Sequence, residues 1–178
     1  MKSGMTIFLV GYAGSGKSSM GRRLARSLEL PFVDTDQRVE QSEGASIADI
    51  FYYQGEVYFR RAERCAIEDV VRNERGSIVA TGGGLPVYGD NMEWMTSQGV
   101  TIYLKRSAEN ILSRLTAYGR EKRPMFRGKS DEELILFMRE QMALREPYYM
   151  RADIVVDCSL MSDADAVEYI VKKLKELK

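Results

Sequence analysis

Short apolar runs alternate with longer amphipathic stretches along the 178 residues of the chain. The runs have the length of β-strands and mostly lack apolar–polar alternation, whereas the stretches between them repeat apolar residues at helical spacing. Strands of this kind separated by helices predict a parallel sheet that is covered on both faces. The five predicted strands cover residues 6–10, 31–33, 77–80, 100–104 and 154–156.

The predicted helices connect these strands, and one interval between them stands out. Residues 119–130 have little apolar content and carry five cations, one of them Lys122, against the single acid Glu121. Concentrated cations and flanking glycines favour a mobile lid at about residues 116–130 that closes over phosphates, with a solvated loop as the alternative. The predicted helices cover residues 17–28, 37–43, 46–75 with a break at Gly55, 90–97 and 107–115, and two more begin at Asp131 and after Ser162.

The segment Gly11–Ser18 matches the pattern G-x-x-x-x-G-K-[ST] and stands between a predicted strand and a predicted helix. Glycines let the backbone wrap around phosphates, and the next helix adds partial positive charge at its N-terminus. We expect Lys17 to reach the β- and γ-phosphates and the Ser18 hydroxyl to hold Mg²⁺. An ordinary glycine-rich turn is the alternative. The predicted ATP-binding residues of the loop are Gly14, Ser15, Gly16, Lys17, Ser18 and Ser19.

Two acids and three glycines follow the second and third predicted strands. Asp34 and Asp36 come at a strand end, where ligands gather in open parallel sheets, although either residue could instead cap the next helix. Gly82, Gly83 and Gly84 indicate a place where a ligand touches the backbone, with a tight turn as the alternative. Because no strand ends in the magnesium-binding acid of large ATPases, we favour a small phosphotransferase in which Asp34 holds the metal through water.

Two arginines lie on or beside apolar stripes of predicted helices. Arg60 follows Phe59 directly, and Glu63 is placed three residues on to brace it. Arg145 continues the apolar row that begins at Leu134, so we expect it to point inward. A cation on such a stripe needs a partner, which a ligand carboxylate, a ligand phosphate or an internal acid would supply. Without that context, Arg60 would be interpreted as part of a solvated face.

Composition narrows the possible functions. The formal net charge is zero, which gives no indication of nucleic-acid or membrane binding, and no apolar run approaches a membrane span of about 20 residues. The chain has no histidine, so proton transfer must fall to another group. Cys65 and Cys158 are interpreted as small buried hydrophobes in a reducing cytoplasm, with a disulfide left open. We expect one cytoplasmic, monomeric domain over residues 1–178, a three-layer α/β/α fold of the P-loop kinase type.

Taken together, these segments resemble the shikimate kinase family. A phosphate loop alone indicates only a nucleotide, but the ordered set of segments is specific and covers nearly the whole chain. The resemblance implies substrate-binding helices at about residues 35–62. The matching segments are the phosphate loop, Asp34–Asp36, Ser46–Phe51, Gly55–Glu56, Phe59–Arg61, Gly82–Gly84, Arg123–Pro124, Arg145 and Pro147–Tyr148.

The resemblance implies that the chain transfers the γ-phosphoryl group of ATP to the 3-hydroxyl of shikimate, giving shikimate 3-phosphate and ADP for aromatic amino acid biosynthesis. By the same resemblance, Arg60 and Arg145 grip the shikimate carboxylate. Asp36 binds the ring hydroxyls and orients or deprotonates the attacking one. Lys17 and Arg123 neutralise charge on the transferred phosphoryl group.

Further contacts are implied in the same way. The backbone amides of Gly82, Gly83 and Gly84 would meet the substrate, and Arg114, on the helix before the lid, would stack on adenine. Two other functions stay open: a gluconate kinase, which has the same fold and takes a polyhydroxy acid, and a nucleotide-binding regulatory module without turnover. Lys17, Asp36 and Arg123 argue against the module, because each lies in the proposed reacting zone.

Overall fold

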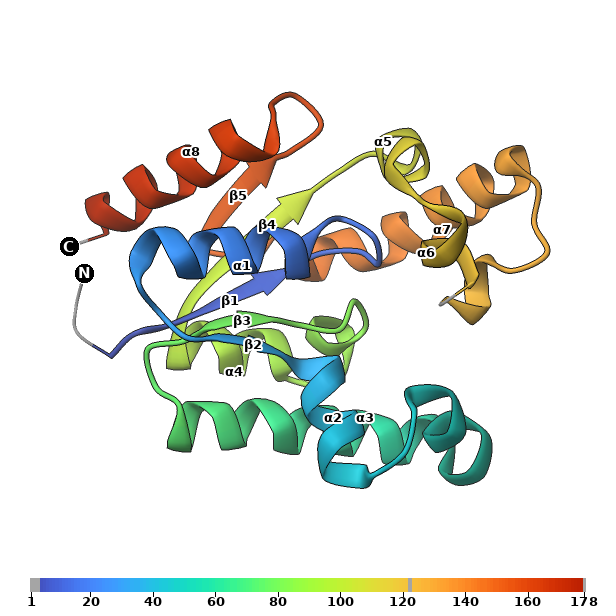
Figure 1. Cartoon of the computed structure of the whole chain (residues 1–178), viewed down its shortest axis with the longest axis horizontal. Helices are drawn as coiled ribbons and strands as arrows, with labels where there is room; N and C mark the ends of the chain where they lie inside the picture. Colours follow the sequence, from blue (N-terminus) through green and yellow to red (C-terminus); the bar gives the residue numbers. More distant parts are fainter. Residues whose placement is uncertain (1–3, 122, 178) are drawn as a thin grey trace.

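Five parallel strands form the centre of the computed structural model, which describes residues 4–121 and 123–177 (Figure 1). The sheet order is β2-β3-β1-β4-β5, so β1 lies in the middle, between β3 and β4. The prediction of a five-stranded parallel sheet is therefore confirmed. The strands are β1 (Thr6–Val10), β2 (Phe32–Asp34), β3 (Ile78–Ala80), β4 (Gly99–Lys105) and β5 (Ile154–Asp157).

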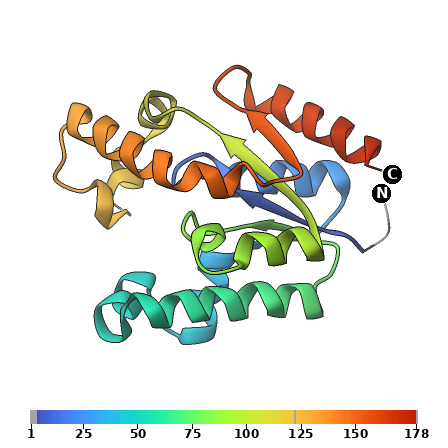
Figure 2. The same ribbon diagram turned by 180° about the vertical axis from the view of Figure 1, so that it is seen from behind.

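Helices cover both faces of the sheet, as the unbroken apolar strands predict. Successive side chains of a strand point to opposite faces, so Ile7 and Leu9 pack with one set of helices, whereas Phe8 and Val10 pack with the other. Figures 1 and 2 show α1 and α8 on one side and α3, α4 and α7 on the other. The α-helices are α1 (Lys17–Leu28), α2 (Thr35–Glu43), α3 (Ile47–Asn73), α4 (Asn91–Gln98), α5 (Ala108–Arg114), α6 (Ala117–Glu121), α7 (Asp131–Tyr149) and α8 (Asp163–Glu176), and two short 3₁₀ turns are η1 (Leu85–Val87) and η2 (Pro124–Phe126).

Helix α2 and the first part of α3 form a smaller body beside the sheet, with its own apolar cluster around Val39, Ile50 and Phe59. The predicted break at Gly55 is confirmed by its φ of 80° and ψ of 174° within α3. Helix α2 begins at Thr35, two residues earlier than predicted, because the Asp34 side chain accepts a hydrogen bond from a backbone amide and so caps it.

The interpretation of both cysteines as buried is wrong for Cys65, which is exposed, whereas Cys158 is buried and both are free thiols. The apolar face of α3 runs through Phe59, Ala66 and Val70. Cys65 falls outside this stripe, because one residue along a helix turns the side chain by about 100°. Within the described residues, no helix is long and apolar enough to cross a membrane.

The predicted lid contains α6 and η2, and Phe126 is one of the side chains that attach it to the body of the protein. Phe126 is fully buried and belongs to the same cluster as Ile111, Leu134 and Met138. Lys122, one of the five cations, lies outside the described residues. Mobility of this segment stays a prediction, but its attachment is far more apolar than the charged sequence around it indicates.

Replacing Phe126 by alanine tests this attachment. Deleting a buried phenylalanine side chain costs about 3–5 kcal/mol, so local opening of residues 117–130 should become about 100-fold more frequent or more. Amide hydrogen exchange of these residues should accelerate accordingly, while the amides of β1 and β4 keep their protection. Met125→Ala, which removes an exposed neighbour, should leave the exchange unchanged. Equal lid protection in Phe126→Ala and the original chain would show that the anchor lies elsewhere.

Candidate active site

The loop that follows β1 folds around the side chain of Lys17. Gly14 and Gly16 have φ angles of 84° and 95°, which lie in the left-handed region that glycine adopts at little cost. Lys17 Nζ donates to the carbonyl oxygens of Gly11 at 2.7 Å and Tyr12 at 2.8 Å. Helix α1 begins at Lys17, so its free N-terminal amides face the loop. The strand, loop and helix predicted from the motif are therefore all present.

Ser18 and Asp34, the predicted metal-binding pair, are in direct contact. Ser18 Oγ donates to Asp34 Oδ2 at 2.6 Å, and Asp34 Oδ1 accepts from the backbone amide of Asp36 at 3.1 Å. Asp34 therefore caps α2 with one carboxylate oxygen and meets the phosphate loop with the other. The capping role, one of the two alternatives predicted from the sequence, is therefore confirmed for Asp34. Its role as a metal ligand stays a prediction.

Asp36 belongs to a cluster of buried charges with Glu63 and Arg60. Arg60 Nη1 donates to Glu63 Oε2 at 2.6 Å, and Glu63 is 1% exposed. Burial raises the pKa of Glu63 to about 7, although the adjacent Arg60 charge opposes this shift. Burial, helped by the charge of Asp34, raises the pKa of Asp36 to about 6 against the pull of Lys17. The cluster therefore holds two carboxyl groups that titrate near neutrality.

The glycines after β3 leave room for this cluster. A Cβ atom at Gly82 would collide with the carboxylates of Glu63 and Asp36, and one at Gly84 would lie 2.5 Å from Arg60 Nη1. A side chain at either position would force these charged side chains to move. The groups that crowd the backbone at Gly82 and Gly84 are the chain's own residues. Contact between these glycines and a ligand stays a prediction.

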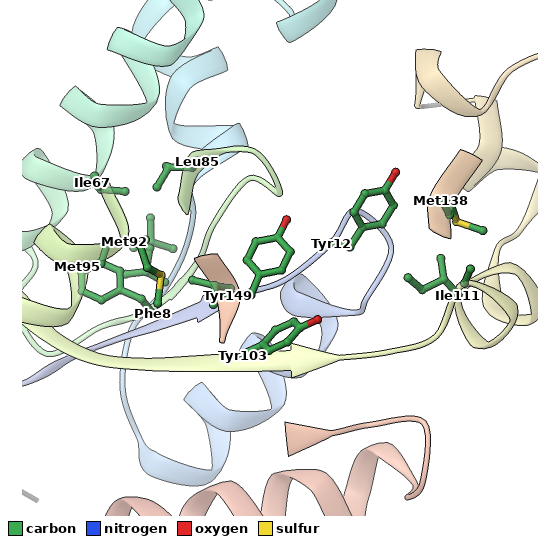
Figure 3. Close-up of a cluster of buried hydrophobic side chains, with 14 of the residues drawn as sticks. Phe8, Tyr12, Ile67, Leu85, Met92, Met95, Tyr103, Ile111, Met138 and Tyr149 are labelled. Carbon is green, nitrogen blue, oxygen red and sulfur yellow. The ribbon is translucent and has the colours of Figure 1, made fainter. Parts of the chain in front are cut away.

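Arg145 points inward, as predicted, and meets a pair of tyrosines. Its Cζ lies 5.4 Å from the centre of the Tyr12 ring, and its Nη2 donates to Gln141 Oε1 at 3.3 Å. Tyr149 donates its hydroxyl to the carbonyl of Gly83 at 2.5 Å, and the charge of Arg145 opposes the burial that raises the pKa of Tyr149 to about 12. Figure 3 shows the hydroxyls of Tyr12 and Tyr149 pointing to the same side, away from β4.

The predicted reacting groups lie within electrostatic reach of one another. Burial lowers the pKa of Lys17 to about 8, with Asp36 opposing the shift and Arg123 and Arg145 adding to it. Arg123 donates to the Gly119 carbonyl within the lid at 2.6 Å and lies within electrostatic reach of Lys17 and Asp36. The structure thus brings together Lys17, Asp36, Arg60, Arg123 and Arg145, which are spread over more than 120 residues of sequence.

The remaining candidates lie on the other side of the phosphate loop. Arg114 forms an ion pair with Asp163 at 2.7 Å, at the first residue of α8. Ser19 is on the exposed side of α1, whereas Ser15 is buried and its hydroxyl has no partner in the described part of the chain. Arg106, which the sequence analysis did not single out, is buried beside them and donates to the Ser15 carbonyl at 2.9 Å.

Sequence reasoning missed Arg106, Tyr12 and Tyr149. Tyr12 stands at a variable position of the loop motif, and Tyr149 ends a helix, so neither carried a pattern. Arg106 directly follows Lys105 at the end of a predicted strand. A cation at a strand end of a parallel sheet is the one signal that could have drawn attention to it.

A phosphate loop with a serine–aspartate pair beside it, and arginines and an aspartate gathered near the loop lysine, are typical of a P-loop phosphotransferase. The family model described as shikimate kinase matches residues 13–175. A curated shikimate kinase of Parabacteroides distasonis is 37% identical over 171 residues, which cover 96% of this chain and 98% of the relative. The chain therefore belongs to the shikimate kinase family, whose members are ATP-dependent kinases.

Solved structures agree with this assignment. The crystal structure of a shikimate kinase from Bacteroides thetaiotaomicron has a TM-score of 0.86 and 34% identity, covering 97% of each chain. A shikimate kinase from Acinetobacter baumannii, solved in complex with shikimate, has a TM-score of 0.87 and 29% identity, covering 99% of this chain and 96% of that one. The predicted P-loop kinase fold is thereby confirmed over nearly the full chain.

The raised pKa values of Asp36 and Glu63 predict a pH dependence of stability. Unfolded aspartate and glutamate titrate near about 3.9 and 4.3, so the folded protein, with values of about 6 and 7, binds more protons in between. The contribution of these two groups to stability is then largest below pH 4 and falls as the pH rises towards 7. Urea unfolding from pH 4.5 to 8 should show this fall, with a shallower slope in Asp36→Asn and no change of slope in the exposed control Glu140→Gln. Parallel slopes for the original chain and Asp36→Asn would contradict the burial of this charge.

Proposed function

We propose that this chain transfers the γ-phosphoryl group of ATP to the 3-hydroxyl of shikimate at the candidate site. One observation carries the assignment. Arg60 and Arg145, from different helices, both lie within electrostatic reach of Tyr149, whose hydroxyl binds the Gly83 carbonyl. Arg60 also acts on Asp36, and Arg145 acts on Lys17. Two guanidiniums beside one carboxylate suit a substrate that carries both a carboxylate and hydroxyl groups.

The arginines bind the acid group of the substrate. Arg60 is already oriented by Glu63 at 2.6 Å and by Glu56 at 3.0 Å, so little side-chain freedom is lost when it meets a carboxylate. Arg145 makes a long hydrogen bond to Gln141, contacts the Tyr12 ring and interacts with the Tyr149 hydroxyl. Its guanidinium carries five N–H donors, so donors remain for a ligand. The structure of the Acinetobacter baumannii relative in complex with shikimate supports this substrate class.

Asp36 accepts the proton of the attacking hydroxyl. With a pKa of about 6, its carboxyl is mostly ionised at neutral pH and is still basic enough to take a proton as the oxygen attacks. The attacking oxygen bonds to the γ-phosphorus, the bond to the β-γ bridging oxygen breaks, and ADP leaves. Lys17 and Arg123 stabilise the negative charge on the transferred group throughout, which is the main source of rate in phosphoryl transfer.

The Ser18–Asp34 pair fits a magnesium site. A hydroxyl and a carboxylate in contact at 2.6 Å at the mouth of the phosphate loop are oxygen donors of the kind that Mg²⁺ takes together with nucleotide phosphates. Ser18 would coordinate the ion directly, and Asp34 would hold it through water. The ion would supply neutralising charge to the β- and γ-phosphates.

We assign the other contacts of the proposed site from where the residues lie around the phosphate loop. Gly14, Ser15, Gly16 and Ser19 line the phosphate loop, and Arg114 lies beyond it, where a base attached to the bound phosphates would extend. The backbone of Gly82–Gly84 contacts Arg60 and Tyr149, where the acid group of the substrate would bind. We further propose that the protein works as a cytoplasmic monomer, with no role for nucleic acid or membrane binding.

Substrate turnover tests the assignment against its two rivals. The protein, with ATP and Mg²⁺, should release ADP with shikimate and give shikimate 3-phosphate, whereas gluconate should give no product above background. Product identity should be established by phosphorus NMR or mass spectrometry, because ADP release alone also reports slow hydrolysis. Turnover of gluconate without shikimate would favour a gluconate kinase, and tight ATP binding without turnover of either acid would favour a regulatory module.

Arg145→Ala separates the acid site from the nucleotide site. Hydrogen bonds to a charged group contribute about 1.5–3 kcal/mol, so the dissociation constant for shikimate should rise about 10- to 100-fold, while that for ADP stays within about twofold. Isothermal titration calorimetry gives both constants. Arg139→Ala is the matched control, because Arg139 lies on the same helix, is 62% exposed and pairs with Glu109. Unchanged shikimate affinity in Arg145→Ala would refute the role of this arginine.

A further inference from the structure

Arg106 is a buried arginine whose contacts converge on the back of the phosphate loop. It follows β4 and is 2% exposed. Its Nε donates to the Ser15 carbonyl at 2.9 Å, its Nη1 donates to Asn110 Oδ1 at 2.7 Å and to the Cys158 carbonyl at 2.8 Å, and its Nη2 donates to Asp163 Oδ1 at 2.6 Å. One side chain therefore joins the phosphate loop, α5, the end of β5 and the start of α8.

Burying a guanidinium is unfavourable unless its charge and its donors are paired. Taking the charge out of water carries a penalty of several kcal/mol that a single ion pair offsets only with good geometry and further hydrogen bonds. Two arginines share the Asp163 carboxylate, because its second oxygen accepts a hydrogen bond from Arg114 at 2.7 Å. The fixed fork of the guanidinium, which places donors in set directions, is what a neutral side chain of similar size would lack.

The contact with Ser15 fixes the direction of the next amide. In a planar trans peptide the C=O and the following N–H point in opposite directions. Arg106 binds the Ser15 carbonyl from outside the loop, so the amide of Gly16 is directed to the opposite side, into the loop. The orientation of the Gly16 amide depends most on this contact. Gly16 has a φ of 95° and no side chain that would restrict its backbone.

We propose that Arg106 is a positioning residue for the nucleotide: it holds the Ser15–Gly16 peptide so that the Gly16 amide faces the bound phosphates. This inference rests on the proposed function, because it assigns a further residue to the same nucleotide site. Asp163 extends the effect, since it bridges Arg106 and Arg114 and so ties the back of the phosphate loop to the arginine proposed to meet adenine. Arg106 thus acts on both ends of the nucleotide without touching it.

Nucleotide affinity tests the proposal directly. In Arg106→Met, which keeps the length of the side chain and removes the charge and the fork, the dissociation constant for ADP with Mg²⁺ should rise at least tenfold. The KM for ATP should rise with it, while the dissociation constant and KM for shikimate stay within about twofold. Arg106→Lys keeps the charge but reaches fewer acceptors, so it should recover part of the lost nucleotide affinity. It also replaces Arg106→Met as the test variant if the methionine variant does not fold.

Arg64→Met is the matched control for a general loss of stability. Arg64 makes a comparable set of bonds to Glu68, Asp90 and Asn91, but these lie on α3 and around the start of α4, outside the site. The Arg64→Met substitution should lower the unfolding temperature without changing ADP affinity. If Arg106→Met also lowers only the unfolding temperature, or weakens ADP and shikimate by the same factor, Arg106 is structural and the proposal fails.

The two arms of the titration keep this proposal separate from the proposed function. Failure of the original chain to bind or phosphorylate shikimate would contradict the assigned substrate. It would not affect the comparison of ADP affinity between the original chain and its Arg106 variants, which alone decides the role of Arg106.

Discussion

The parallel pairing of β1 with its neighbours is the constraint on which the candidate site depends. Parallel strands end at the same edge of a sheet, so the segments that follow them meet there whatever their distance in sequence. The pairing of β1 with β3 and of β2 with β3 brings the phosphate loop, the acids after β2 and the glycines after β3 to one edge. The pairing of β1 with β4 brings Arg106 to the back of the same loop.

The pKa values of the charged groups at this edge are set by burial as much as by ion pairing. Loss of water raises the pKa of Asp36 and Glu63 and lowers that of Lys17, so that all three titrate between about 6 and about 8. Opposite charges nearby limit these shifts and keep a basic carboxylate beside an ammonium group. Such a site has the groups that phosphoryl transfer requires without a histidine, which this chain lacks.

Three arginines show how differently a cation can be held in one fold. Arg60 is fixed by acids on its own helix, at i−4 and i+3, so its geometry is a local property of α3. Arg106 is fixed by groups from four separate segments, and Arg145 by the ring of Tyr12, the Tyr149 hydroxyl and a long hydrogen bond to Gln141. The more a guanidinium relies on its own helix, the more of its placement can be read from sequence spacing.

The sequence was sufficient for much of the site. Asp34 and Asp36, the phosphate loop and the inward direction of Arg145 were predicted from strand ends and helical spacing, because these depend on interactions between near neighbours. The burial of Cys65 was predicted wrongly, since the stripe of a helix is set by what packs against it. The lid was predicted from its charge, but its attachment through Phe126 was not, because one apolar residue forms no pattern.

By itself, then, the sequence determined the five strands, the phosphate loop and most of the charged residues of the candidate site. Only the tertiary structure decided that Asp34 serves both the α2 cap and Ser18, that Arg60 approaches the backbone of Gly84 while Arg145 contacts the Tyr12 ring, and that a buried guanidinium holds the loop from behind. The physical reason is range. Periodicity and motif spacing report interactions within one element, whereas these contacts join segments that only sheet formation brings together.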